Sequence, residues 1–134
     1  MKNSQKLNYQ NLLDSIPVPI FYKGTDGKYL GMNKAFEDFF GASRENLVGK
    51  GVHDITDKEY ADVYFKKDKE LFDNPGVQIY ETQVKDNQGN IHEVVFNKAT
   101  FFDEDDEVAG LVGTILDVTE RVNAEKEITE KQRR

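Results

Sequence analysis

The chain of 134 residues contains no cysteine and no tryptophan, and it has only three prolines and two histidines. Without cysteine it has no disulfides, thiolate metal sites or thiol adducts, which excludes every cysteine-based catalytic scheme. No apolar run approaches the ~20 residues of a membrane-spanning helix, and no signal-peptide pattern follows Met1. We therefore expect a cytoplasmic protein without direct membrane insertion.

Basic charge is also scarce. The sequence has 18 Lys and Arg residues against 25 Asp and Glu residues, for a formal net charge of −7. Basic residues do not alternate with aromatic residues in any stripe, which argues against nucleic acid as a partner. No Ser/His/Asp pattern, glycine-rich phosphate loop or metal-ligand cluster is present. We therefore expect no catalytic residues and no metal site, and thus no enzyme.

The first half of the chain predicts helices around a short hairpin. Residues 1–16 form a helix that Pro17 ends, with one apolar stripe at i, i+3, i+4 and i+7: Tyr9, Leu12, Leu13 and Ile16. Two β-prone runs, 18–23 and 28–32, flank a turn that contains Asp-Gly. A further helix extends from the N-cap Asn33 to Gly41. The longest internal helix begins at a capping-box pattern, Thr56 with Glu59, and ends near residue 74.

The second half predicts three long strands, 77–85, 91–102 and 108–118, joined by the polar loops 86–90 and 103–107. Such a succession forms an antiparallel meander. The last strand is apolar enough for burial on both faces. At Asp117 the sequence changes from apolar to charged residues. A charged helix follows from residue 120 to residue 134, with Thr119 as its N-cap. A core strand thus continues into a solvated helix without a flexible linker.

The ordered set of elements and motifs resembles a PAS domain over roughly residues 8–134. The residues that carry the resemblance are 25–27 (Thr-Asp-Gly), 33–36 (Asn-Lys-Ala-Phe), Gly41, 87–89 (Asn-Gln-Gly) and above all the closing run 110–121, which ends in Asp-Val-Thr-Glu-Arg. In the last hairpin Asp106 stands where the family often has glycine, and aspartate tolerates the left-handed backbone that this turn needs.

The resemblance implies an α+β fold with a five-stranded antiparallel sheet of order 2-1-5-4-3. The helices between strands two and three would cover one face and enclose a small cavity. The PAS core would span residues 17–119, between an N-terminal flanking helix at 1–16 and a C-terminal signalling helix at 120–134.

The function that the resemblance implies is that of a sensory module in signal transduction. It would transmit a ligand- or partner-induced change through the C-terminal helix to a downstream output domain, and it would form a homodimer through its flanking helices. The parent protein would be a histidine kinase of a two-component system or a diguanylate cyclase. Two alternatives stay open: a ligand-free PAS module for dimerisation and coupling, and a small enzyme on a PAS-like fold.

Several cofactors of the family are excluded by composition. The flavin–cysteinyl and thioester-linked chromophore branches both need cysteine, which this chain lacks. Haem-binding members commonly use a histidine of the long helix, and residues 56–74 contain none. His53 and His92 are expected to be solvated or hydrogen-bonded. Non-covalent flavin stays open, and the identity of any ligand is unknown.

The expected ligand pocket rests on polar groups that face inward. Alternation along residues 94–101 puts Asn97 on the opposite face from Phe96 and Lys98, and the family alignment directs Asn97 toward the helices. Asp68 lies on the apolar face of the long helix and needs a partner there. The expected pocket residues are Phe36, Phe40, Tyr64, Asp68, Tyr80 and Asn97. The alternative is that Asp68 bonds to a loop backbone and the aromatic side chains simply pack.

The expected signal relay is the joint between the last strand and the C-terminal helix. Its residues are Asp117, Thr119, Glu120 and Arg121. In this hypothesis the Asp117 side chain ties the strand end to a neighbouring strand or lysine, and Thr119 starts the helix. The alternative is that Asp117 and Thr119 only cap the helix.

Overall fold

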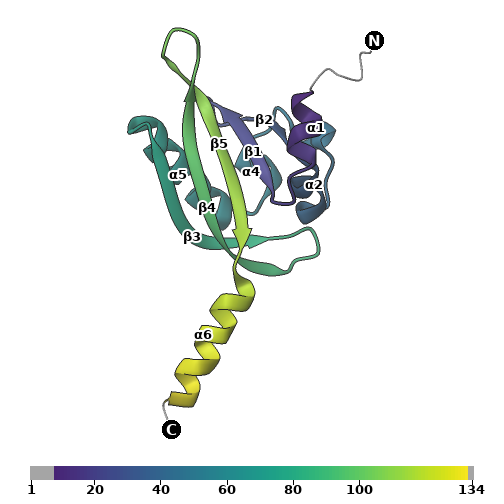
Figure 1. Ribbon diagram of the computed structural model, residues 1–134, viewed down its shortest axis with the longest axis vertical. Helices are drawn as coiled ribbons and strands as arrows, with labels where there is room; N and C mark the ends of the chain where they lie inside the picture. Colours follow the sequence, from purple (N-terminus) through teal and green to yellow (C-terminus); the bar gives the residue numbers. More distant parts are fainter. Residues whose placement is uncertain (1–7, 133–134) are drawn as a thin grey trace.

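The computed structural model describes residues 8–132 as five strands and six helices (Figure 1). In chain order these elements are α1 (Tyr9–Asp14), β1 (Ile20–Gly24), β2 (Tyr29–Met32), α2 (Lys34–Phe40), α3 (Arg44–Leu47), α4 (Val52–Ile55), α5 (Lys58–Asp73), β3 (Val77–Lys85), β4 (Ile91–Phe102), β5 (Val108–Asp117) and α6 (Thr119–Gln132). The order of helices and strands is the one expected from the sequence.

The five strands form one antiparallel sheet of order β2-β1-β5-β4-β3, which confirms the predicted α+β fold. The two polar loops of the meander form tight turns. In the last hairpin Asp106 adopts a φ of 61°, so aspartate does supply the left-handed residue of this turn. The two edge strands are β2 and β3, and β5 lies at the centre between β1 and β4.

Glycine in β5 allows the core to pack closely against the sheet. A Cβ added at Gly113 would collide with the Phe21 ring. Gly113 pairs with Phe21 of the neighbouring strand β1, so the absence of a side chain leaves room for that ring over the sheet. Gly113, inside the apolar run of β5, therefore has a packing role.

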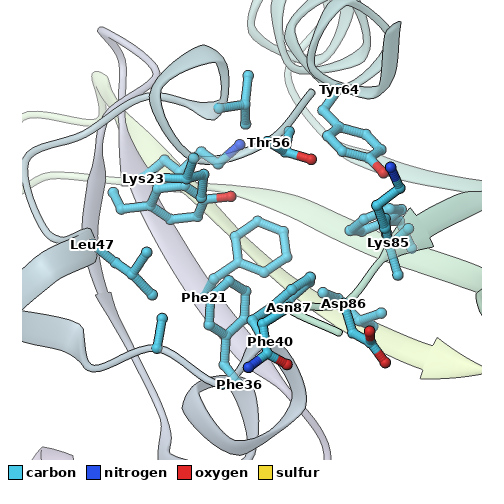
Figure 2. A pocket seen from close by; sticks show the side chains of 18 of the residues that line it. Phe21, Lys23, Phe36, Phe40, Leu47, Thr56, Tyr64, Lys85, Asp86 and Asn87 are labelled. Atoms are coloured by element: carbon cyan, nitrogen blue, oxygen red, sulfur yellow. The ribbon is translucent and has the colours of Figure 1, made fainter. Parts of the chain in front are cut away.

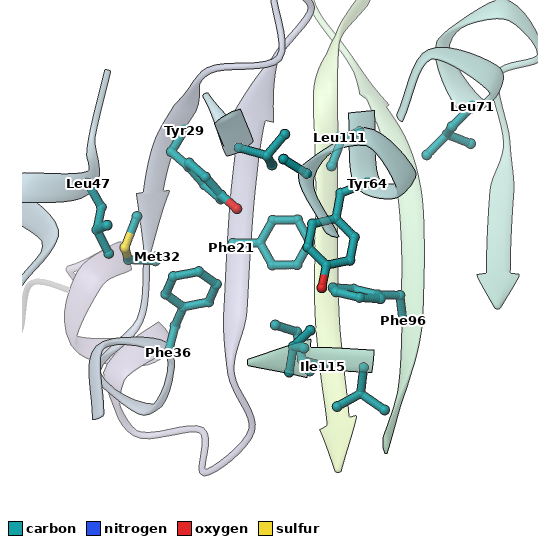
Figure 3. Packing of buried hydrophobic residues seen from close by; sticks show 14 residues of the cluster. Phe21, Tyr29, Met32, Phe36, Leu47, Tyr64, Leu71, Phe96, Leu111 and Ile115 are labelled. Atoms are coloured by element: carbon teal, nitrogen blue, oxygen red, sulfur yellow. The ribbon is translucent and has the colours of Figure 1, made fainter. Parts of the chain in front are cut away.

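Helices α2 to α5 lie on one face of the sheet, and the hydrophobic core fills the space between (Figure 1). The Phe21 ring is at the centre of this core, with ring centroids 6.0 Å from Tyr29, 5.8 Å from Phe36 and 6.1 Å from Phe96 (Figure 3). The centre of the core is therefore a set of aromatic rings that pack edge to face or tilted against one another.

Asn33 joins three segments at the N-terminal side of the fold. The side chain is fully buried. Its Oδ1 accepts hydrogen bonds from the backbone N–H of Phe36, as the predicted N-cap, and of Ile20 at the start of β1. Its Nδ2 donates to the backbone carbonyls of Leu13, Ile16 and Val18. This one amide thus fixes α1, β1 and α2 together.

The helix boundaries differ in places from the expectation. The N-terminal helix is described from Tyr9 to Asp14, and residues 1–7, which belong to the predicted helix 1–16, lie outside the described residues. Helix α5 begins at Lys58, one residue later than predicted, with Asp57 instead of Thr56 as N-cap and no side-chain cap hydrogen bond. The capping box expected from Thr56 and Glu59 is therefore not formed.

Helix α6 leaves the domain as a straight extension beyond the end of β5 (Figure 1). It begins at Thr119, one residue before the predicted start, and is described to residue 132; residues 133 and 134 of the predicted helix lie outside the described part. Only Val118 separates it from β5. No helix among the described residues is long and apolar enough to cross a membrane.

Candidate functional site

A cavity with a volume of about 270 Å³ lies between the sheet and its helices (Figure 2). Aromatic and aliphatic side chains form most of its walls: Phe21, Tyr29, Phe36, Phe40, Leu47, Val52, Ile55, Tyr64, Val84, Phe96 and Ile115. Gly41 and Asn87 also line it and are exposed, so the cavity reaches the surface on their side. A mostly apolar hollow with a few polar groups is typical of small-molecule sites.

Two lysines and one aspartate form a buried charged cluster at this cavity. Lys23 of β1 and Lys98 of β4 both line the cavity, and each is only 2% exposed. Asp68 of α5 accepts hydrogen bonds from both ammonium groups, at 2.6 Å from Lys23 Nζ and 2.7 Å from Lys98 Nζ. Lys98 Nζ also donates to the Tyr80 hydroxyl at 2.7 Å. The cluster joins α5 to strands on both sides of β5.

Burial governs the acid–base properties of this cluster. It lowers the pKa of Lys98 to about 8, although Asp68 acts in the opposite direction. Burial likewise raises the pKa of the Tyr80 and Tyr64 hydroxyls far above their usual range, so both stay protonated. Lys23 Nζ lies 4.8 Å from the Tyr29 ring centroid, and Lys98 Nζ lies 4.7 Å from that of Tyr80. The aromatic faces therefore contribute to holding the two cations.

The structure brings five of the six expected pocket residues together. Phe36, Phe40 and Tyr64 line the cavity. Asp68 and Tyr80 are outside its lining and contact it through Lys98. Asp68 thus pairs with lysines, and the alternative that it bonds to a loop backbone is wrong.

The expected position of Asn97 is wrong. Asn97 is exposed, whereas its neighbours Phe96 and Lys98 are buried and line the cavity. The alternation along β4 has the expected period, but the opposite set of side chains faces the helices. The physical reason is Asp68, which neutralises part of the lysine charge inside the core and so allows Lys98 to be buried.

Lys23 and Lys98 are the site residues that the sequence interpretation missed. A signal for them was present, because Asp68 on an apolar helix face requires a cationic partner. Lys23 follows Phe21 at strand spacing, and Lys98 follows Val94 and Phe96 at the same spacing. A lysine that shares the two-residue spacing of the apolar strand residues therefore indicated a lysine on the buried face.

The joint between β5 and α6 is held by hydrogen bonds to β4. Asp117 Oδ1 accepts from the backbone N–H and the hydroxyl of Thr119, at 3.0 and 2.6 Å. Thr119 Oγ1 in turn accepts from the backbone N–H of Glu93, at 2.9 Å. The backbone N–H of Val118 donates to the Glu93 carbonyl, at 2.7 Å. The first turn of α6 is thereby fixed to the sheet.

His92 connects this joint to the cavity. Its Nδ1 lies 2.8 Å from Asp117 Oδ2, and its Nε2 lies 2.8 Å from Asp86 Oδ2. Asp86 lines the cavity. The hydrogen bond to Asp86, with a smaller contribution from Asp117, raises the pKa of His92, and the hydrogen bond to His92 holds the pKa of Asp86 at about 2. One imidazole therefore bridges the cavity and the start of α6.

The other two expected relay residues lie in the first turn of α6. Glu120 is exposed there, at the positive end of the helix dipole. Arg121 is half exposed and pairs with Glu81 of β3, with 3.0 Å between Nη2 and Oε1. It also approaches Glu125 one helical turn further on, at 3.6 Å. Exposed pairs of this kind contribute little to stability, so Asp117, Thr119 and His92 form the stronger part of the joint.

A protein-family model described as PAS fold matches residues 13–123, which is most of the chain. The chain therefore belongs to the PAS fold family, as its sequence indicated. The PAS domain of BvgS from Bordetella pertussis has a similar structure, with a TM-score of 0.74 and 21% sequence identity, over 93% of this chain and 94% of that one. This likeness supports the fold.

Two curated signalling proteins are similar in sequence. The aerobic respiration control sensor protein ArcB of Escherichia coli K12 is 28% identical over 112 residues, which cover 84% of this chain and 14% of ArcB. Sporulation kinase C of Bacillus subtilis 168 is 25% identical over 127 residues, which cover 89% of this chain and 28% of the kinase. The chain thus corresponds to a small part of each protein, and it is a PAS domain related to signalling proteins of this kind.

Proposed function

We propose that this PAS domain is a sensory module that transmits the state of its cavity through α6 to a downstream output domain. The observation that carries the proposal is the His92 bridge, which connects Asp86 at the cavity to Asp117 at the start of α6. The hydrogen bonds of Thr119 then make the helix a direct continuation of the sheet. The relatives ArcB and sporulation kinase C support a kinase as the output.

The mechanism follows from the arrangement of the mouth of the cavity. Asn87 packs so closely against Gly41 that a Cβ on Gly41 would collide with its side chain. A ligand or partner that moves this loop also moves Asp86, and His92 passes the displacement to Asp117 and Thr119. Such a change biases the helix only as far as the ligand binds the two states with unequal affinity. The relay thus needs no movement of the whole sheet.

The test is a chimera in which this chain replaces the matched segment of sporulation kinase C. The Ala42→Phe substitution places a large ring at the cavity lining and stands in for a ligand. We expect it to change autophosphorylation by about fivefold or more, which corresponds to a coupling free energy at the low end of ~1–3 kcal/mol. The Asp117→Ala substitution should leave the domain folded and abolish this response.

The matched control is Asp38→Ala, which removes an exposed carboxylate of α2 that pairs with Lys34, at 3.5 Å. This variant should respond to Ala42→Phe as the unaltered chimera does. A response that persists in the Asp117→Ala chimera would reduce the joint to a helix cap and refute the relay.

The division of the chain follows from the same proposal. Residues 17–119 serve as the sensing core, residues 1–16 as an N-terminal flanking helix and residues 120–134 as the signalling helix. The proposal includes dimerisation through the flanking helices. The cytoplasm is the expected compartment. Exposed apolar side chains of both flanking helices support the homodimer, because a second copy would bury them. They are Tyr9 and Leu12 of α1 and Ile128 of α6, which are 88%, 47% and 56% exposed.

A second candidate function is a ligand-free module for dimerisation and coupling. The face of the sheet opposite the helices favours it, because Val77, Ile79 and Leu116 are 75%, 63% and 51% exposed there. In this alternative the cavity is a packing defect. The absence of any response to Ala42→Phe, together with a stable dimer, would support this alternative over the sensory function.

A further inference from the structure

The buried cluster at the cavity carries more positive than negative charge. Lys23 and Lys98 contribute two ammonium groups, and Asp68 contributes one carboxylate. The side chains of all three are at most 7% exposed. Lys98 keeps its proton in most molecules at pH 7, since its pKa is about 8. An unbalanced charge away from water is unfavourable unless a counterion is near, so the cluster favours the approach of an anion.

The geometry leaves the positive groups on the side of the cavity. Lys23 and Lys98 line it, and Asp68 does not. Asp68 lines instead a separate surface pocket with Phe65 and Phe72 of α5 and the β1–β2 turn. The two lysine side chains thus border the cavity whereas their shared carboxylate does not, so a ligand in the cavity lies closer to the lysines than to Asp68.

Both ammonium groups also have hydrogen-bond capacity to spare. Each ammonium donates up to three hydrogen bonds. Within residues 8–132, Lys23 donates one, to Asp68, and Lys98 donates two, to Asp68 and the Tyr80 hydroxyl. The remaining donors are on groups that are 2% exposed, where bulk water does not satisfy them. An acceptor inside the cavity would complete them.

We infer that the cavity binds a small organic monoanion, a carboxylate whose head group pairs with Lys23 and Lys98 and whose apolar body lies against Phe21, Phe36 and Phe40. This inference rests on the proposed sensory function and names the class of its ligand. One net positive charge matches one carboxylate. The cavity of about 270 Å³ is just below the usual range of about 300–1,000 Å³ for ligand sites, which favours a small compound.

The aromatic walls argue for an apolar body and against inorganic phosphate. A phosphate dianion brings more charge than the cluster balances, and it leaves the rings Phe21, Phe36 and Phe40 without a partner. A carboxylate with a short aromatic or branched chain offers a partner both to the lysines and to the rings. It accepts hydrogen bonds through two oxygens and buries its chain against the rings.

The experiment compares acids with their neutral amides on the full 134-residue chain, shown to be ligand-free by native mass spectrometry. The probes are benzoate, phenylacetate and isovalerate against benzamide, phenylacetamide and isovaleramide, titrated by calorimetry and followed by amide NMR shifts. We expect at least one carboxylate to bind about tenfold or more tightly than its amide, because only the anion pairs with the buried cations. The shifts should centre on β1 and β4.

Two variants locate the charge that the anion meets. Lys98→Met removes the charge, keeps most of the length of the unbranched side chain, and should weaken carboxylate binding by about tenfold or more while leaving amide binding unchanged. Lys23→Met serves the same purpose if Lys98→Met does not fold. The matched control is Lys28→Met, which removes the same charge from an exposed position in the β1–β2 turn and should change neither affinity.

Amides that bind as tightly as their acids would overturn the inference, and so would a set of six probes that leaves every cavity resonance in place. A carboxylate preference that survives in both cavity variants would also overturn it, since the charge would then lie elsewhere. None of these results would refute the sensory function, because the kinase chimera tests that function without any added ligand.

Discussion

At the residue scale, the unusual feature is one carboxylate that holds two buried ammonium groups. Removing Asp68 leaves both cations without their counterion, whereas removing one lysine leaves a balanced pair. We expect Asp68→Asn to lower the free energy of unfolding by ~3–5 kcal/mol. Lys98→Met should lower the free energy of unfolding by much less than Asp68→Asn does, or raise it. Urea denaturation followed by circular dichroism measures both.

The comparison between these two variants is decisive because they remove opposite partners of the same ion pair. Equal losses for Asp68→Asn and Lys98→Met would mean that the hydrogen bonds matter and the charge balance does not. In that case the argument for an anionic ligand would lose its physical basis as well.

His92 gives the domain a pH dependence whose sign is fixed by its two carboxylate partners. Its pKa is raised in the folded state, so its contribution to stability is complete below the unfolded pKa of about 6.5 and is lost as pH rises through the folded pKa. Asp86 has a lowered pKa, so its contribution is present above about 3.8 and is lost as pH falls toward 2. The bridge is therefore strongest between about pH 4 and 6.5.

We expect the free energy of unfolding to fall by up to about 1 kcal/mol between pH 6 and 8 from this bridge, the range of partly exposed ion pairs. His92→Gln should flatten that part of the pH profile, and Asp86→Asn should move the NMR titration midpoint of His92 back toward 6.5. A His92 midpoint at or below 6.5 in the unaltered domain would show that the bridge is absent in solution.

At the element scale, local signals were sufficient for most of the fold. Asn33 and Gly41 mark the limits of α2, and in the structure they are its N-cap and its left-handed C-cap. Short polar loops fixed the meander of β3, β4 and β5. The order of the five strands, by contrast, came from the resemblance to PAS domains. Strand order depends on contacts between distant segments, which patterns along the chain do not record.

Patterns along the chain could not predict which face of β4 packs against the helices. Alternation fixes which side chains share a face but leaves open which face is buried, and a shift by one residue exchanges them. The family alignment directed Asn97 toward the helices, which put Lys98 on the other face, and lysine is in any case almost never fully buried unless paired. Its partner Asp68 is 30 residues away, and Lys23 is 45 residues from Asp68. The pairing of Asp68 with the two lysines, which decides which face of β4 is buried, exists only in the folded chain.

At the scale of the whole molecule, the proposed dimer depends on the exposed apolar side chains of the two flanking helices. Helix α6 has few apolar side chains, and Ile128 is 56% exposed. A helix of this length is marginal alone in water, so a partner for α6 would add to its stability. Helix α1 offers Tyr9 and Leu12 as a second exposed apolar pair. In the proposed symmetric dimer, burial of these side chains by a second copy would stabilise the assembly.

We therefore expect the chain to be a dimer whose stability depends on these side chains. Leu12→Glu and Ile128→Glu should each weaken dimerisation about tenfold or more, because each buries a charge without a partner in the interface. Size-exclusion chromatography with light scattering, repeated over a range of concentrations, measures the change. The matched control is Leu30→Glu, which places the same charge at an equally exposed leucine, 51% exposed, on the edge strand β2. If Leu30→Glu dissociates the dimer and the helix variants do not, the interface lies at the sheet edge and not at the flanking helices. Helix α6 would then lie outside the dimer contact.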